Sequence, residues 1–332
     1  MTDDPILSRR LMLLGATASA ALALAGCGKR PAGQDAVLRA SVTGHGETDA
    51  RLIFKSAGIK PAGFSVTYAE FQSGQMVIEA LNGGSLDLGG MSEIPPVFAL
   101  ASAIQSFKQI AVFHGDVNNQ VVLVPRGSRI ETLAQLKGKR VGYVRATTSQ
   151  YYLIRMLQSV GLDWSDIEPV ALNVSDGASA FSNGALDAWA IYGFPIQRAV
   201  ATEGARILKT ALGFLSGNYI VSAHVDALAD AARAKIIGDY LRLLKRGFGW
   251  TASHQGEWAG IVARDIGVPP AYVADQFKRQ SDVFSLRPVT AEAIASQQGV
   301  ADLFAERKLI PHKVDVRTLW DDRYNAIIEE KA

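Results

Sequence analysis

Two stretches of the chain repeat the same order of secondary-structure patterns about 100 residues apart. The first runs from residue 38 to 90 and the second from 140 to 191. Each passes from an apolar run through a small polar loop to apolar residues at helical spacing. Asp87 and Asp187 occupy matching places in them. A repeat this long is not a solenoid, whose repeats run to about 20–50 residues. It predicts two similar β-α-β-α-β units, and therefore mainly parallel sheets that helices cover on both faces.

The length of the chain favours two lobes, because single cores stop growing at about 250–300 residues. We expect a bilobal α/β fold in which two doubly wound, mainly parallel sheets are joined by a hinge. The expected lobes are residues 37–122 with 222–332, and residues 123–221. Strands 120–124 and 218–223 flank the second unit and are the candidates for the two crossings between lobes. Ligand crevices in open α/β sheets lie at the carboxyl ends of strands, so we expect a shared cleft that closes on a small ligand.

The N-terminal residues predict export and lipidation. Ser8-Arg9-Arg10 precedes an uncharged run from Leu11 to Ala25, which ends at Leu24-Ala25-Gly26-Cys27, and Cys27 is the only cysteine. This segment resembles a bacterial lipoprotein signal. We expect residues 1–26 to be a signal peptide, 27–36 a lipidated tether and Cys27 the lipid attachment site. The twin arginine resembles a twin-arginine export signal, with the general secretory route as the alternative.

These features place the mature chain on the periplasmic or cell-surface side, anchored to a membrane by lipid. The leader is too short and alanine-rich to be a membrane span, which needs about 20 apolar residues. Which membrane holds the lipid stays open.

The charge balance argues against nucleic acid as a partner. The formal net charge is +2, and removing residues 1–26 leaves it unchanged because two aspartates and two arginines cancel. Proteins that track phosphates need a concentrated basic surface, and no basic run is present. With Cys27 used for lipid, no thiol remains for a metal site or a nucleophile. We expect no cofactor, no metal and no catalytic residue.

The best candidate for an anion site is the loop Arg145–Ser149, between a strand and the start of a helix. The positive end of the helix dipole and the hydroxyls of Thr147, Thr148 and Ser149 could hold an anion, and Arg145 adds a positive charge. The alternative is that one hydroxyl only caps the helix and that Arg145 is solvated.

Other candidate ligand contacts lie at strand ends. The segment Gly90-Met91-Ser92 ends the third strand of the first unit, and its glycine allows a ligand to approach the backbone. Trp189 and Tyr192 could supply apolar contact, together with Phe113 and Phe194, although Trp189 could equally belong to the core of its lobe.

Two histidines remain ambiguous. His45 lies in a glycine-flanked loop, and His114 is expected at a strand end of the same lobe. They could contact the anion, or serve as a base with Glu47, Asp49 or Asp116 as partner, or simply pack or face solvent. Neither has zinc-ligand spacing.

Several ordered motifs resemble one family, the aliphatic sulfonate-binding proteins of the sulfonate, taurine and nitrate group of ABC-transporter substrate-binding proteins. The motifs lie in Gln75–Gly89, Ile94-Pro95-Pro96, Asp187–Ile191, Ala301–Phe304 and Lys313–Arg317. The resemblance implies a type II periplasmic-binding-protein fold, delivery of a captured anion to a membrane permease, and no chemistry on the ligand. It also implies that the ligand is contacted by Thr43, Gly44 and His45, by Gly90–Ser92, by Thr147–Ser149, and by Trp189 with Tyr192.

The chain departs from the family pattern at a few positions. Met91 stands where small polar residues are usual, Ala146 where glycine is common, and Gly193-Phe194 where an acid and a proline usually follow. Met91 and Phe194 make the expected pocket more apolar, which favours a larger or aromatic tail over nitrate or taurine.

We therefore expect a monomeric, non-enzymatic solute-binding lipoprotein for a sulfonate-type anion. The alternatives are an enzyme on the same bilobal scaffold, or a binder of taurine, nitrate or a thiamine-precursor pyrimidine.

Overall fold

The computed structural model describes residues 36–330. The predicted signal peptide, Cys27 and all of the tether except Ala36 lie outside the described residues. Within the described range, no helix is both long and apolar enough to cross a bilayer.

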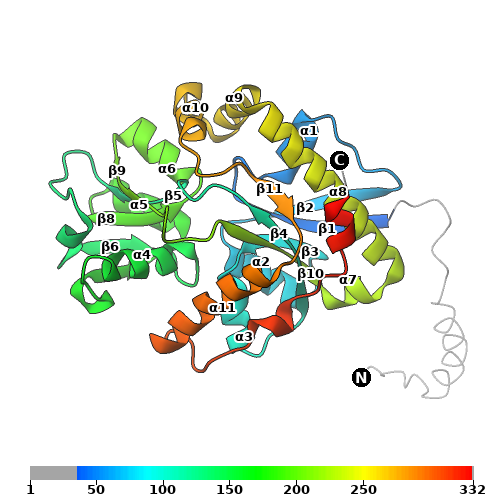
Figure 1. Ribbon diagram of the computed structural model, residues 1–332. Helices are drawn as coiled ribbons and strands as arrows, with labels where there is room; N and C mark the ends of the chain where they lie inside the picture. Colours follow the sequence, from blue (N-terminus) through cyan, green and yellow to red (C-terminus); the bar gives the residue numbers. More distant parts are fainter. Residues whose placement is uncertain (1–35, 331–332) are drawn as a thin grey trace, which may run out of the picture. The chain divides into compact units, whose positions relative to one another are not determined.

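The strands form two separate sheets (Figure 1). The six-stranded sheet has the order β11-β4-β10-β3-β1-β2, and its strands are β1 (Ala36–Thr43), β2 (Phe64–Phe71), β3 (Leu88–Ser92), β4 (Phe107–His114), β10 (Asn218–His224) and β11 (Ser285–Arg287). The five-stranded sheet has the order β7-β6-β8-β5-β9, and its strands are β5 (Gln120–Val124), β6 (Arg140–Tyr143), β7 (Glu168–Ala171), β8 (Ala188–Tyr192) and β9 (Arg206–Thr210).

The helices alternate with these strands along most of the chain. They are α1 (Ala50–Ser56), α2 (Gly74–Asn82), α3 (Pro95–Ala101), α4 (Thr148–Gln158), α5 (Val174–Ser182), α6 (Pro195–Arg198), α7 (Val225–Ala229), α8 (Ala231–Ser253), α9 (Gln255–Ile266), α10 (Pro270–Lys278), α11 (Ala291–Glu306) and α12 (Asn325–Glu329).

The two sheets share a topology, as the sequence repeat predicted. In the first, β1 lies between β2 and β3 and is parallel to both; in the second, β6 lies between β7 and β8 and is parallel to both. One strand in each sheet, β10 or β5, runs antiparallel to both of its neighbours. These reversed strands are the ones the chain enters from the other sheet, and the crossings lie in residues 115–119 and 211–217, just before them.

The same arginine–aspartate arrangement, which we call the aspartate clamp, occurs in both units. It joins the first strand of each unit to the turn before its third strand. The backbone N–H of Arg39 donates to Asp87 Oδ2 at 2.9 Å, and its guanidinium donates to the same carboxylate and to the carbonyl of Gly84. Arg140 repeats this pattern on Asp187, with the same 2.9 Å backbone bond. The matching places of the two aspartates therefore correspond to the same structural role.

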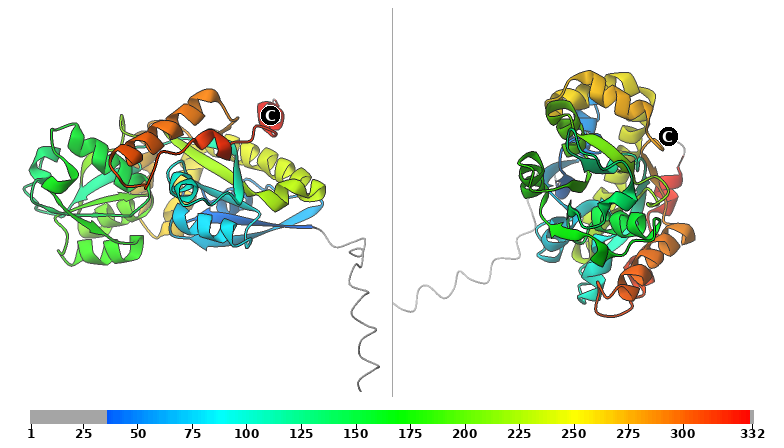
Figure 2. Two further views of the ribbon diagram at one scale, coloured as in Figure 1. Left: turned by 90° about the horizontal axis from the view of Figure 1, so that it is seen from below. Right: turned by 90° about the vertical axis from the view of Figure 1, so that its left-hand side faces the viewer.

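Helices cover both faces of each sheet, as expected for a doubly wound fold. One core of the first sheet includes Ile53, Leu241 and Phe248 beneath α1 and α8, and another includes Val97 and Phe304 beneath α3 and α11. In the right-hand view of Figure 2, α9 (yellow) and α11 (orange) lie on opposite sides of the molecule. The second sheet has one core beneath α4 and a second beneath α5 and α6.

Candidate functional site

A cavity of about 190 Å³ is lined by residues that belong to both sheets. The loops after β1, β3 and β4 contribute to it from the first sheet, and the start of α4 and the end of β8 from the second. Parallel strands point their carboxyl ends at this edge, which explains why their loops meet there. Eight of the predicted ligand contacts line the cavity: Thr43, His45, Gly90, Met91, Ser92, Thr147, Thr148 and Tyr192.

At the start of α4, the three hydroxyl residues have different roles. Thr147 caps the helix, since its Oγ1 accepts from the N–H of Ser149 and donates to the carbonyl of Val144 at 2.8 Å. Ser149 Oγ accepts from the N–H of Val144 at 2.9 Å. Both hydroxyls are therefore used internally, whereas that of Thr148 makes no hydrogen bond with another described residue and the side chain lines the cavity.

Backbone geometry holds this loop under strain. Ala146 adopts φ 57°, a left-handed conformation that costs a non-glycine residue about 1–2 kcal/mol. The N–H of Ala146 donates to Gln150 Oε1 at 2.8 Å, which fixes the loop to the first turn of α4. The first N–H groups of a helix have no backbone partner within the helix. The cap uses that of Ser149, and the N–H of Thr148 remains available to an anion.

Only one of the two equivalent helix starts suits an anion. The helix that follows β1, α1, is capped by Asp49, whose carboxylate accepts from the N–H groups of Arg51 and Leu52. The helix that follows β6, α4, has the neutral Thr147 as its cap. An anion is favoured at the start of α4, whereas at the start of α1 the carboxylate of Asp49 already occupies the N–H groups and pairs with Arg51.

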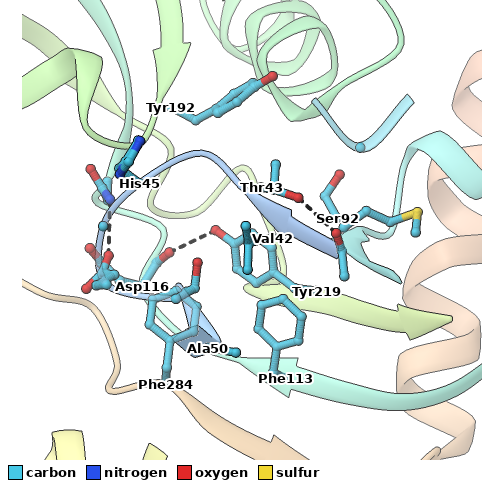
Figure 3. Close-up of a pocket in the computed structure, with 18 of the residues that line it drawn as sticks. Val42, Thr43, His45, Ala50, Ser92, Phe113, Asp116, Tyr192, Tyr219 and Phe284 are labelled. Atoms are coloured by element: carbon cyan, nitrogen blue, oxygen red, sulfur yellow. Dashed lines mark hydrogen bonds between the residues drawn. The ribbon is translucent and has the colours of Figure 1, made fainter. Parts of the chain in front are cut away.

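Tyr192 lies on the opposite side of the cavity from Thr43 and Ser92 (Figure 3). Its hydroxyl is buried and has no hydrogen-bond partner among the described residues. Burial raises the pKa of Tyr192 above its usual value, so the group stays a neutral donor at physiological pH. Thr43 Oγ1 donates to the carbonyl of Gly90 at 3.1 Å, which joins the two loops from the first sheet.

The remaining predicted contacts do not line the cavity. Trp189 is 1% exposed and packs in the core beneath α5, against Phe181, because it alternates along β8 with residues that face α4. Ser149 is used by the helix start, and Arg145 is exposed. His114 binds Asn218 and Asp282. Gly44 adopts φ 66° beside the ring of Phe194 and shapes the loop.

His45 lines the cavity but has both ring nitrogens engaged. Nδ1 lies 3.1 Å from Asp265 Oδ2, and Nε2 lies 3.1 Å from Glu70 Oε1. Asp49 is used as the helix cap. The geometry therefore gives His45 neither a free nitrogen for an anion nor one for a hydrolytic role.

Part of the cavity wall is acidic, which sequence reasoning did not assign to ligand contact. Glu47, Asp116, Asn119 and Gln120 line it, and no lysine or arginine among residues 36–330 does. Glu47 Oε1 accepts from Asn119 at 3.1 Å. No group of three or more His, Cys, Asp or Glu side chains in the described range could hold a metal ion.

The pKa values of these acids are raised. Burial first, and then the charge of Asp116, raise the pKa of Glu47 to about 8, although hydrogen bonds from Asn119, Gln280 and Gln276 favour the ionised form. Burial also raises the pKa of Asp116. The raised pKa reduces the negative charge that Glu47 presents to the cavity near neutral pH.

Three aromatic side chains, Phe113, Tyr219 and Phe284, line one part of the cavity, which we call the aromatic arm (Figure 3). Phe113 stacks on Tyr219 with ring centroids 5.1 Å apart, and Phe284 lies 5.5 Å from Tyr219. The expectation of an apolar pocket rested on Met91 and Phe194, which both line the cavity. Tyr219 and Phe284 were missed because they reach the cavity from distant parts of the chain.

The chain is similar to known proteins over most of its length. The family described as NMT1/THI5 like matches residues 59–257. An aliphatic sulfonates-binding protein of Escherichia coli (strain K12) is 33% identical over 257 residues, which cover 77% of this chain and 79% of that protein.

Solved structures extend the similarity to the fold. The periplasmic aliphatic sulphonate binding protein of Escherichia coli has a TM-score of 0.74 and 29% identity, covering 87% of this chain and 93% of that one. The alkanesulfonate-binding protein of Xanthomonas axonopodis pv. citri, bound to MOPS, also has a TM-score of 0.74, with 27% identity over 86% of this chain and 98% of that one. These relatives are binding proteins, and their fold is the bilobal type II periplasmic-binding-protein fold. The chain therefore belongs to the aliphatic sulfonate-binding proteins, within the NMT1/THI5-like family.

Proposed function

We propose that this protein is the extracytoplasmic binding component of an ABC importer and captures a sulfonate-type anion in the cavity between its two sheets. The observation that carries this proposal is the start of α4, where Thr147 and Thr148 line a cavity that no lysine or arginine of residues 36–330 lines. The names of the relatives support the ligand class. The protein performs no chemistry on its ligand.

The sulfonate is held by neutral donors. Thr148, Tyr192 and Ser92 supply hydroxyls, and α4 supplies N–H groups. Hydrogen bonds to a charged group contribute roughly 1.5–3 kcal/mol each, and micromolar binding is about 8 kcal/mol. Four or five such bonds reach this value before the entropic cost of association, so contact between the ligand's tail and the aromatic arm supplies the rest.

The lobes close by bending at the two crossings. The lobes follow the division predicted from the sequence, residues 37–122 with 222–332 and residues 123–221, with each boundary moved by a few residues so that β5 stays in the second lobe and β10 in the first. The hinge then lies in 115–119 and 211–217. Ligand contacts from both lobes favour the closed form, which the permease then recognises.

The leader completes the proposal. Residues 1–26 direct export, and lipid on Cys27 holds a monomeric protein beside its permease through a tether that ends near Ala36. Replacing Cys27 with serine should abolish fatty-acid labelling in an expressing bacterium and release the protein from the membrane fraction. Labelling that survives this change would refute lipidation at Cys27.

The export route is tested separately. Replacing Arg9 and Arg10 with lysine preserves the charge but removes the twin arginine. Blocked export would assign the twin-arginine route, and normal export would assign the general secretory route.

A thermal-shift panel tests the ligand class. Alkyl and aryl sulfonates should stabilise the purified protein, by about 2.7 kcal/mol at a hundred times Kd. Taurine, nitrate and pyrimidines cover the alternative ligands, and pentanoate, which carries the same butyl chain as butanesulfonate, is the matched carboxylate. If no sulfonate stabilises the protein, the proposal is wrong.

A further inference from the structure

Two buried acceptor atoms line the cavity without a donor. Asp116 is 0% exposed and Gln120 is 3% exposed. Asp116 Oδ2 and Gln120 Oε1 have no hydrogen-bond partner within the described part of the chain. Leaving a buried acceptor unpaired is costly, so each such group calls for a specific explanation.

The other oxygen of Asp116 is fully used. Oδ1 accepts from the N–H of Asn118 at 2.8 Å, from the N–H of Ser281 at 2.9 Å and from Ser281 Oγ at 3.1 Å. These bonds hold the carboxylate in one orientation. They link the segment between β4 and β5 to the loop after α10, and they leave Oδ2 free to meet a ligand.

Tyr219 connects the two free acceptors and fixes the amide of Gln120. Its hydroxyl donates to the backbone carbonyl of Asp116 at 3.2 Å (Figure 3). Because that proton is committed, Tyr219 accepts from Gln120 Nε2, at 2.7 Å. The amide oxygen of Gln120 is therefore left as an acceptor beside Asp116.

The surroundings of these two acceptors suit a positively charged group on a ligand. No lysine or arginine in the described range lines the cavity, and both ring nitrogens of His45 face other carboxylates. Phe113 and Phe284 flank Tyr219 and also line the cavity. Aromatic faces attract ammonium groups and the methylenes next to them.

We propose that Asp116 and Gln120 form a subsite for a protonated amine on the tail of the ligand, so that the preferred ligand is an amino-alkanesulfonate. This rests on the proposed function, since the sulfonate end is held at α4 and Thr148. The ammonium donates to Asp116 Oδ2 and Gln120 Oε1, while the tail lies along the aromatic arm. The ligand is then zwitterionic, which suits a cavity with carboxyl groups and no basic side chain other than His45.

Three probes that differ only in their terminal group test the subsite on the unmodified protein. Aminopropanesulfonate, hydroxypropanesulfonate and butanesulfonate end in ammonium, hydroxyl and methyl. By calorimetric titration, the amine should bind about tenfold to a hundredfold tighter than the methyl compound, with the hydroxyl compound between them. Equal affinity of the amine and methyl compounds would overturn the proposal and assign the acceptors to ordered water. Equal affinity of the amine and hydroxyl compounds would overturn the role of charge, and with it the proposal.

A pair of variants locates the effect. Asp116→Asn keeps the shape of the side chain and should erase the preference for the amine while retaining butanesulfonate binding. Asp282→Asn is the matched control, because Asp282 is 44% exposed, pairs with Arg287 and does not line the cavity. Its preference should match that of the unmodified protein. A preference that survives in Asp116→Asn would overturn the assignment.

Binding of the three probes distinguishes a wrong amine subsite from a wrong ligand class. If butanesulfonate binds and the amine brings no gain, only the subsite is wrong. If none of the three sulfonates binds, the sulfonate function fails and the subsite falls with it.

Discussion

Thr148 is the hydroxyl residue of α4 whose side chain lines the cavity without an internal partner, whereas Thr147 and Ser149 are tied to Val144. Replacing Thr148 with alanine should weaken butanesulfonate binding about tenfold, because one hydrogen bond to a charged group is lost. Calorimetric titration measures the change. Arg145→Ala is the control and should bind normally, since Arg145 is exposed and away from the cavity. Unchanged affinity in Thr148→Ala would reject this hydroxyl as a ligand contact.

The raised pKa of Glu47 makes the folding stability depend on pH. Its pKa is raised from 4.5 to about 8 by burial and by Asp116, with Tyr219 and three amide side chains as the other nearby groups. Between these pH values the folded protein keeps a proton that the unfolded chain releases, so stability falls as pH rises through this window and levels off above it.

The Glu47→Gln variant removes this titration. Its melting temperature minus that of the unmodified protein should therefore increase from pH 5 to pH 8 and then stay constant. Scanning calorimetry across this range measures the difference. Parallel profiles for the two proteins would contradict a raised pKa.

At the scale of single residues, the sequence predicted those cavity-lining residues that follow from local patterns. Thr148 and Tyr192 lie where a strand–loop–helix pattern and a broken strand placed them. The position of Trp189 could not be predicted in this way. The strand β8 is buried on both sides, so its sequence does not show which side of the sheet Trp189 faces. Asp116 and Gln120 carried no local signal, since their role depends on donors from distant residues such as Ser281 and Tyr219.

At the scale of elements, the matching aspartate clamps should differ in strength. The Asp87 side chain is 1% exposed and also lies 3.4 Å from Arg233, whereas the Asp187 side chain is 33% exposed. Burial raises the pKa of Asp87, but hydrogen bonds from Arg39 outweigh it and hold the pKa below its usual value. This stabilisation is present above the unfolded pKa and is lost as pH falls through the lower folded value.

Replacing Asp87 or Asp187 with asparagine, one at a time, tests whether the two clamps differ in strength. We expect Asp87→Asn to lower the free energy of unfolding by about 2–3 kcal/mol, because it removes a buried carboxylate that two arginines, Arg39 and Arg233, share. Asp187→Asn should cost less than about 1 kcal/mol, since solvent screens an exposed pair. Denaturant unfolding curves at pH 7 measure both. Equal losses would show that the clamps are equivalent despite their burial.

The elements themselves were largely predictable. The sequence predicts a helix start near Pro95, because the residue before a proline usually avoids helical angles. The helix α3 does begin at Pro95, but Ile94 before it already has helical angles, so the expected reason does not hold. The sequence predicts a third strand from Leu86, whereas β3 starts at Leu88. The backbone of Asp87 nevertheless bonds to Arg39 and His224 on its two sides. The helix predicted from Leu228 divides at Asp230, whose side chain caps α8.

At the scale of the whole molecule, the sequence repeat predicted two similar sheets with loops meeting at one edge. It could not predict how the C-terminal segment joins them. Phe304 of α11 packs against Tyr151 of α4, with ring centroids 5.8 Å apart, and Arg307 pairs with Asp163. These contacts join α11, which packs on the first sheet, to elements of the second sheet. The partners lie far apart in the sequence, so no local pattern predicts them.

The most direct test of the central claim is a crystal structure of the protein with bromoethanesulfonate, whose bromine and sulfur are located by anomalous scattering. We expect the sulfonate oxygens to lie within hydrogen-bond distance of Thr148 and of the first N–H groups of α4, with the bromine directed toward Tyr219. A sulfonate bound away from α4, or a cavity left empty at saturating ligand, would contradict the account.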